Sequence, residues 1–254
     1  MSRVRIGCCG WCVKGGRKAY FEKFNVTEVQ STFYKLPRPQ TASKWAEEAV
    51  GDFEFTMKAW QAITHPPSSP TWRKAGIRIP KSKADRYGLL KPTEENFEAW
   101  EKTLEICRAM KAKVCIAQTP ASFKHCEENV RNVEEFFSTI NREDVLIGWE
   151  PRGDWKEHLD DVKKLCDKLD LIHVVDPFRV RAVSSHEIAY FRLHGIGKGE
   201  VNYRYRYSDT DLKRLKNIVL EELENRKKVY VLFNNLWMAE DASRFKEIIS
   251  ASRR

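Results

Sequence analysis

Short runs of β-branched and aromatic residues recur along the chain, and most are followed by a segment with helical spacing or by a long loop. We expect eight strands, over Val4–Gly10, Val26–Thr32, Glu54–Ala59, Val114–Thr119, Val145–Glu150, Leu171–Asp176, Ala189–Gly195 and Lys228–Asn234. The clearest helices are expected over Thr41–Val50, Thr93–Met110, Glu127–Ile140, Trp155–Leu169, Ser208–Asn225 and Ala239–Ser250. Two of them begin with a capping residue and an acidic first turn, at Thr93 and at Ser208.

Strands that alternate with helices predict parallel βαβ units, and eight of them predict closure into a TIM-type (β/α)8 barrel of the α/β class. Only about a dozen residues separate the sixth and seventh expected strands, so the helix there should be reduced or missing. A long loop, residues 60–92, follows the third expected strand. The alternative is an open doubly wound sheet, but no Gly-x-Gly-x-x-Gly follows the first expected strand. We expect one domain over residues 1–254.

The polar residues keep a constant phase within the expected strands. Tyr190, Arg192 and His194 alternate with Phe191 and Leu193, and the second and third expected strands alternate similarly. Because successive strand side chains point to opposite faces, we expect the apolar phase against the helices and the polar phase in the lumen and its mouth. Six strands also end in polar residues. Barrel enzymes carry their chemistry at the C-terminal strand ends, so we expect a functional pocket there.

Composition narrows the class of protein. Of 254 residues 42% are hydrophobic, which is too many for a disordered chain. No stretch approaches the roughly 20 apolar residues that cross a bilayer, and the N-terminal segment does not resemble a signal peptide, so a soluble, cytoplasmic protein without membrane contact is expected. Seven cysteines do not form a disulfide framework. We interpret Cys8, Cys9 and Cys12 as reduced thiols, because a zinc site would need a second Cys-x-x-Cys pair.

Charged residues of both signs are expected to meet at the barrel mouth, where they compensate one another. Histidine is the natural proton shuttle, and Lys58 and Arg192 suit a phosphate or carboxylate of the substrate. We expect the catalytic group to be Glu28, Lys58, Glu150, Asp176, Arg192 and His194. Amide, aromatic and further polar side chains are expected to bind substrate: Trp11, Tyr34, His65, Gln118, Arg152, Asn234 and Asn235. The aromatic residues, with Trp155, either stack on a substrate ring or pack at the rim.

A metal is the alternative use of the same mouth. Glu150, Asp176 and His194 could bind Mn, Zn or Mg, and some barrel hydrolases, including apurinic endonucleases, hold metals at such strand ends. That comparison is fold analogy only. His-rich spacing is absent, and Arg192 beside these residues would repel a cation. We therefore assign no metal, and the cofactor stays open.

The long loop is strongly basic. Residues 71–91 carry seven basic residues against Asp85 alone, a net charge of +6, interleaved with Trp72 and Tyr87. Basic charge with aromatic residues is typical of nucleic-acid contact, although a solvated basic surface is the alternative in a chain of net charge +9. The loop at Tyr203–Tyr207 has a similar composition. The candidate nucleic-acid-binding residues are Arg73, Lys74, Arg78, Lys81, Lys83 and Arg86.

Several strings resemble one known family. Ile6–Trp11, Thr27–Pro37 and Phe53–Ala59 are joined by Ile63–His65, Gln118–Pro120, Glu150–Arg152, Val175–Pro177, Arg192–Gly195 and Phe233–Asn235, in order along nearly the whole chain. They resemble the domain-of-unknown-function-72 family, also called YecE-like. The resemblance implies a TIM-type barrel and no established activity. This chain departs from the family at two places. Gln30 stands where the family usually has Asn. Residues 150–153 read Glu-Pro-Arg-Gly where Glu-Phe-Arg-His is common, so a role for that His does not carry over to this chain.

Three functions remain open. The first is a hydrolase or phosphate-handling enzyme that acts on nucleic acid or a nucleotide-like substrate at the C-terminal mouth. The second is a non-catalytic nucleic-acid-binding barrel that uses the basic loop of residues 71–91. The third is a protein that binds a small anionic metabolite, such as a phosphorylated molecule. The oligomeric state does not follow from the sequence.

Overall fold

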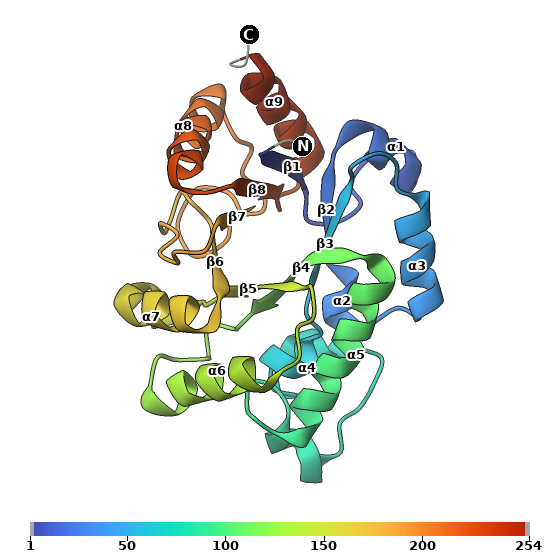
Figure 1. Ribbon diagram of the computed structural model, residues 1–254, viewed down its shortest axis with the longest axis vertical. Helices are drawn as coiled ribbons and strands as arrows, with labels where there is room; N and C mark the ends of the chain where they lie inside the picture. The colour runs from blue at the N-terminus through green and yellow to red at the C-terminus, as the bar shows by residue number, and fades with distance from the viewer. Residues whose placement is uncertain (1–2, 252–254) are drawn as a thin grey trace.

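The computed structural model describes residues 3–251. Within them eight parallel strands pair in chain order and close into a barrel (Figure 1). The strands are β1 (Val4–Cys8), β2 (Val26–Val29), β3 (Glu54–Lys58), β4 (Ala112–Gln118), β5 (Leu146–Glu150), β6 (Leu171–Val175), β7 (Ile188–Leu193) and β8 (Lys228–Phe233). The predicted TIM-type barrel is confirmed. Several strands end one to three residues earlier than expected, because the polar residues there begin the connecting loops.

All six expected helices are present, with shifted ends. They are α3 (Pro39–Glu48), α5 (Glu94–Met110), α6 (Glu127–Thr139), α7 (Leu159–Leu169), α8 (Asp209–Asn225) and α9 (Met238–Ala251). The helix expected from Trp155 is divided at His158, so that a 3-10 helix, η3 (Gly153–Glu157), precedes α7. Thr93 and Ser208 cap α5 and α8 as their sequence indicated.

The sequence patterns missed the shorter helices. These are α1 (Gly16–Lys23), α2 (Ser31–Tyr34) and α4 (Gln61–Thr64), with the 3-10 helices η1 (Pro70–Lys74) and η2 (Lys81–Arg86). The first follows a glycine and has no side-chain cap, so it lacks the usual start signal. The last three lie in the segment expected to be a loop, which is therefore largely made of short helical turns. By contrast, the described residues 176–187 contain no helix, which confirms the missing helix after β6.

The apolar side chains of the strands pack against the helices on the outside of the barrel, as expected. Phe55 and Met57 of β3 pack in a cluster that includes Trp100 of α5, and Phe191 of β7 packs with Leu212 of α8. The lumen differs from the expectation that it would hold the polar phase. Its middle is filled by a separate apolar cluster: Cys9, Val26, Val114, Ile116, Ile172, Val174, Ile188, Tyr190, Tyr230 and Leu232. Charged side chains are thus confined to its two ends.

Two inward-facing glycines let the barrel close tightly. A Cβ added to Gly7 of β1 would lie 2.0 Å from the carbonyl oxygen of Val26 in β2. A Cβ added to Gly148 of β5 would lie 2.6 Å from the Cγ2 of Val174 in β6. Contacts this short require the backbone or a packed core side chain to move. The barrel therefore depends on glycine at both positions.

A buried ion network closes the N-terminal end of the lumen. Arg5 of β1 is 1% exposed and pairs with Glu54 at 2.8 Å and with Asp52 at 3.0 Å. Glu54 also pairs with Lys228 at 2.8 Å and accepts a hydrogen bond from Tyr230. Burial alone would raise the pKa of Glu54, but hydrogen bonds from Lys228 and Tyr230 and the charge of Arg5 lower it. The carboxylate is therefore a structural counter-charge.

We expect Glu54→Gln to lower the free energy of unfolding at pH 7 by about 3 kcal/mol, because it removes the buried counter-charge of Arg5 and leaves the exposed Asp52 as its remaining partner. The folded-state pKa of Glu54 lies below its unfolded value, so its contribution is present above pH ~4.3 and is lost as the pH falls through the folded pKa. Urea denaturation at pH 7 and at pH 3.5 should show a smaller difference at the lower pH. The control Glu98→Gln, at an exposed site on α5, should change stability by less than about 0.5 kcal/mol. Equal loss in both variants would contradict the assignment.

Candidate active site

The guanidinium of Arg192 lies at the centre of the C-terminal mouth. Its Nε and Nη2 contact the two carboxylate oxygens of Glu28 at 3.0 and 2.9 Å, and its Nη1 pairs with Glu150 and donates to Gln118 at 3.3 Å. Tyr190 donates to the same Glu28 at 3.0 Å. Arg192 and Glu28 are 1% and 0% exposed. One side chain of β7 thus joins β2, β4 and β5, which brings together four of the residues that the sequence selected.

Arg152 extends this network toward His194. Its Nε and Nη2 donate to one oxygen of Glu150 at 3.0 and 2.7 Å, and its Nη2 lies 3.1 Å from His194 Nε2. Burial would raise the pKa of Glu150, but the charges of Arg152 and Arg192 hold it well below its usual range. Burial lowers the pKa of His194 well below its ordinary value; Glu150 opposes this, and Arg192 and Arg152 add to it. His194 is therefore a neutral hydrogen-bond acceptor here, which argues against its expected role as proton shuttle.

Asp176 follows β6 and faces the same mouth, but its negative charge is less fully neutralised by cations than that of Glu150. Its Oδ2 accepts the backbone N–H of His194 at 2.9 Å and its Oδ1 accepts that of Phe178 at 3.1 Å. The nearest cation that the structure gives it is Arg179, with Nε at 3.7 Å. Burial raises the pKa of Asp176 to about 6, because these two N–H groups and Arg179 offset the loss of solvent only in part. Asp176 can therefore gain or lose a proton near neutral pH.

Lys58, at the end of β3, has the opposite charge and a similar environment. Its side chain is buried; Nζ donates to Gln118 at 2.9 Å and lies 3.8 Å from the centre of the Phe33 ring. Within residues 3–251 no carboxylate lies within 4.0 Å of this ammonium, although Glu28 and Glu150 act on it from farther away. Burial, and then the charge of Arg192, lower the pKa of Lys58 to about 7. A buried ammonium with no direct counter-ion is costly for the fold.

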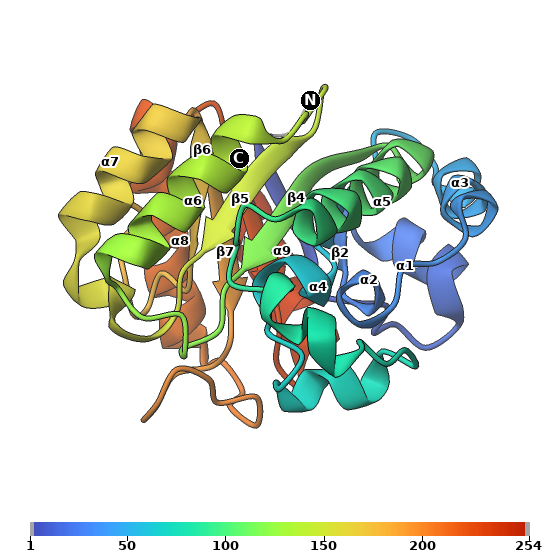
Figure 2. The same cartoon turned by 90° about the horizontal axis from the view of Figure 1, so that it is seen from below.

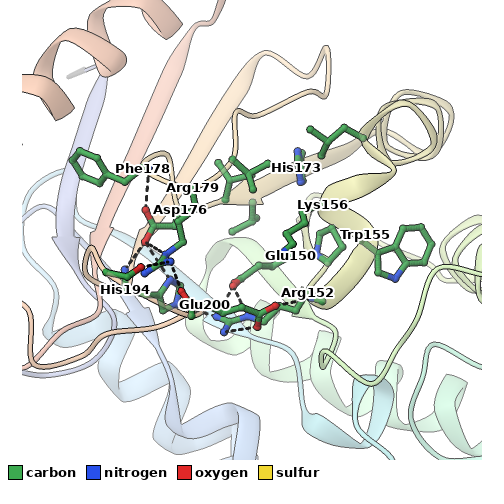
Figure 3. A pocket seen from close by; sticks show the side chains of 18 residues that line it. Glu150, Arg152, Trp155, Lys156, His173, Asp176, Phe178, Arg179, His194 and Glu200 are labelled. Atoms are coloured by element: carbon green, nitrogen blue, oxygen red, sulfur yellow. Dashed lines mark hydrogen bonds and ion pairs between the residues drawn. The ribbon is translucent and has the colours of Figure 1, made fainter.

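A cavity of about 450 Å³ opens beside this network. Figure 3 shows Asp176, Arg179 and His194 on one side of it and Glu150 and Arg152 close by. The cavity continues along β6 between η3, α7 and the segment after β6, where it is lined by Trp155, Leu159, His173, Val175, Phe178 and Val180. Its second half thus occupies the flank that the missing helix leaves uncovered. Lys58, Glu28 and Arg192 do not line the cavity, although Arg192 contacts the lining residue Glu150.

Three residues that the sequence offered for substrate contact are engaged in packing instead. Trp11 is half-buried and packs edge-to-face on Tyr20, with ring centres 5.2 Å apart, against the core. Asn235 is buried and donates to Asp241 of α9 at 2.8 Å. Trp155 is 0% exposed and its indole N–H donates to a backbone carbonyl, so it is a packed wall of the cavity and not an exposed stacking surface.

The other candidates lie near the mouth in different settings. His65 is buried, and burial, followed by the charges of Lys58 and Arg152, lowers its pKa to about 3, so it is neutral. Tyr34 is half-buried, borders a separate groove, and has the Lys74 ammonium 5.1 Å from its ring centre. Asn234 is half-buried directly after β8.

The donor set of Glu150, Asp176 and His194 does not fit a metal ion. Both carboxylate oxygens of Glu150 are occupied by guanidinium groups, and both oxygens of Asp176 accept backbone N–H groups. The Nε2 of His194 faces Arg152. Two cations that approach the same ligands also oppose a third.

The sequence patterns did not select Tyr190 and Arg179, which both lie at the site. Tyr190 has the same strand phase as Arg192 and His194, and that phase could have identified it. Arg179 lies three residues after Asp176 in a turn, where no strand or helix periodicity applies. Cys8, Cys9 and Cys12 are free thiols; Cys9 faces Arg192 in the lumen, and burial raises its pKa well above the ordinary value.

The basic segment divides into paired and unpaired charges. Lys83 and Arg86 pair with Glu95 of α5 at 3.3 and 3.2 Å, whereas the exposed Arg73, Arg78 and Lys81 have no ion pair with the described residues. Figure 2 shows this segment, in teal, projecting below the barrel at the same end as the orange connection between β7 and α8. The segment therefore borders the mouth, as the sequence predicted.

The closed barrel of eight parallel strands places this protein in the class of TIM-barrel proteins, and its cavity lies at the C-terminal mouth. The family model "Protein of unknown function DUF72" matches residues 5–253, and the chain belongs to this family. The UPF0759 protein YunF of Bacillus subtilis is 24% identical over 91% of this chain and 84% of its own length. The solved DUF72 protein of Enterococcus faecalis has a TM-score of 0.74 at 19% identity, covering 97% of both chains.

Other solved barrels share the fold. The DUF72 protein of Thermotoga maritima has a TM-score of 0.71 at 23% identity and covers 98% of this chain and 100% of its own. Endonuclease IV from Thermus thermophilus has a TM-score of 0.55 at 11% identity, covering 97% of this chain and 98% of its own. Among the described residues, no helix has the length and apolar character needed to cross a membrane.

A heteronuclear NMR titration should measure the pKa values of Asp176 and Lys58 directly. We expect the carboxyl carbon of Asp176 to titrate near pH 6 and the Cε of Lys58 near pH 7, while Glu150 stays ionised from pH 4 to 8. Asp176→Asn and Lys58→Met identify the two signals. Ordinary pKa values, near 4 and 10.5, would mean that the side chains are hydrated and not buried as described.

Proposed function

We propose that the chain is an acid–base hydrolase that acts on a phosphate ester of a nucleotide-like substrate at the C-terminal mouth of the barrel. The observation that carries this proposal is the pair formed by Lys58 and Asp176. Each is buried, neither has a counter-ion closer than 3.7 Å among the described residues, and their pKa values lie at about 7 and about 6. Groups that exchange protons near neutrality are what acid–base catalysis requires.

The charges around Lys58 favour an anionic substrate. Glu28 is already held by Arg192, and Glu150 is shared between Arg192 and Arg152, so neither is free to neutralise Lys58 directly. An incoming phosphate would supply that missing negative charge and could also accept hydrogen bonds from Arg152. Binding would then raise the pKa of Lys58 and keep it protonated.

Asp176 supplies the second half of the chemistry. As a carboxylate it would take a proton from the water that attacks phosphorus, and Lys58 would give a proton to the oxygen that leaves as the ester P–O bond breaks. The proton count closes, with one proton gained by Asp176 and one lost by Lys58. Neutral His194, whose backbone N–H holds Asp176 and whose ring faces Arg152, would position Asp176 and Arg152.

The form of the cavity suits a two-part ligand. Its volume of about 450 Å³ is typical of small-molecule sites. Glu150, Arg152, Asp176 and Arg179 line one part, and Leu159, Val175, Phe178 and Val180 line the other. The phosphate would occupy the inner end of the first part and extend past the lining to Lys58, and the sugar or base would occupy the second part. Endonuclease IV, which has the same fold, acts on nucleic acid by its name, but at 11% identity the likeness supports the fold alone.

Hydrolysis of a dinucleoside phosphodiester tests the proposal, because this phosphate does not titrate near neutrality. We expect a bell-shaped dependence of kcat/KM on pH. The rate should rise as Asp176 loses its proton near pH 6 and fall as Lys58 loses its proton near pH 7. Nucleoside monophosphates and a single-stranded oligonucleotide complete the substrate panel.

Asp176→Asn and Lys58→Met should each lower kcat/KM at least about 100-fold, which is the usual contribution of a general acid or base. Asp144→Asn and Lys113→Met, at exposed positions, are the matched controls and should leave the rate unchanged. A rate unaffected by either mouth variant, or turnover of none of the three substrate types, would overturn the proposal.

A second function rests on the unpaired charges of the basic segment. If the mouth receives a nucleic acid, Arg73, Arg78 and Lys81 lie at its border to contact phosphates. Reversing these three charges to Glu should weaken binding of a single-stranded oligonucleotide at least about 10-fold at low salt and reduce the salt dependence measured by fluorescence anisotropy. Lys83→Ala with Arg86→Ala should matter less, because Glu95 already neutralises them. An equal effect of both sets would argue against directed binding by this segment.

A further inference from the structure

Two histidines and an aspartate converge outside the mouth. His125 lies in the connection from β4 to α6, and His158 and Asp161 lie at the start of α7. One potential ligand atom from each lies within 4.8 Å of the other two. His158 and Asp161 are three residues apart, which places their side chains on the same face of the helix. The cluster therefore joins two separate strand–helix connections.

The surrounding contacts hold His125 in place. Its backbone N–H donates to Asp154 at 3.0 Å, its ring packs edge-to-face on Trp155 with centres 4.9 Å apart, and its Nε2 lies 3.1 Å from Asp161 Oδ2. His158 lies over the other ring, with centres 3.8 Å apart and planes 10° from parallel. His158 is exposed, and His125 and Asp161 are half-buried, so water and ions reach the cluster.

We propose that His125, His158 and Asp161 bind a divalent transition metal, with Zn²⁺ as the probe. Two imidazoles and one carboxylate suit zinc and its first-row neighbours, and they suit Mg²⁺ and Ca²⁺ poorly. Ligand atoms around tetrahedral zinc lie about 3.3 Å apart, given bonds of about 2.0 Å. His125 and Asp161 already have this spacing. Because parallel rings direct their lone pairs side by side, His158 must turn on binding, and its exposed side chain permits this.

The site is separate from the proposed catalytic mouth. His125 and Asp161 border a groove of about 420 Å³ between α6 and α7, and neither lines the cavity beside Asp176. Lys164 Nζ lies 3.3 Å from Asp161 Oδ1 and is the cation that a divalent ion would displace. Metal binding here does not require the proposed hydrolase activity.

Calorimetric titration of EDTA-treated, full-length protein tests this inference. We expect one equivalent of Zn²⁺ to bind and Mg²⁺ to give no binding heat. His125→Ala, His158→Ala and Asp161→Asn should each weaken Zn²⁺ binding at least 10-fold. Asp160→Asn, at an exposed neighbouring position on α7, is the matched control and should bind as the unaltered chain does. Circular dichroism checks that each variant is folded.

An exposed thiol next to the cluster needs its own control. Cys126 follows His125 directly and could bind zinc by itself. Cys126→Ser should retain the stoichiometric binding. Binding that survives all three cluster variants, or that is lost in Cys126→Ser but kept in His158→Ala, would overturn the proposed site. Absence of stoichiometric Zn²⁺ binding to the unaltered chain would overturn it as well.

Discussion

The buried guanidinium of Arg192 is the constraint on which the mouth of the barrel depends. It holds Glu28 through two contacts, Glu150 through a third and Gln118 through a fourth, so β2, β5 and β4 are fixed relative to β7. A guanidinium stays charged at every physiological pH, and its planar fork fixes the carboxylates in direction as well as in distance. Removing it would leave Glu28 buried without its counter-charge and Glu150 with Arg152 alone. The neighbouring groups are therefore placed by this single residue.

The ion pairs among Arg192, Arg152 and the two glutamates explain why Lys58 and Asp176 have pKa values near neutrality. Carboxylates that are fully engaged by Arg192 and Arg152 cannot also solvate Lys58, and the cations that engage them lie too far to ionise Asp176 fully. Burial then decides both pKa values. Free carboxylates in the same places would be available to a metal ion, whereas these carboxylates are taken up by guanidinium groups.

The sequence predicted the barrel, its eight strands and the missing helix, because strand periodicity and the spacing between strands are local properties. Alternation within β7 also predicted that Arg192 and His194 face the interior. Periodicity could not show that the middle of the lumen is apolar, since that depends on which strands face one another. Nor could it find Arg179, which a turn positions, or the packed setting of Trp11, which long-range contacts determine.

The absence of a helix between β6 and β7 changes how a molecule can approach Asp176 and its neighbours at the mouth. In a complete barrel each strand is covered by its own helix, and access is limited to the direction of the axis. Here the cavity runs from Asp176 along the outer side of β6 to Val180. A bound molecule can thus bend over the rim, with one portion above the axis and another against the wall. The size of a molecule that fits is then limited by the length of the cavity along β6 and not by the diameter of the barrel.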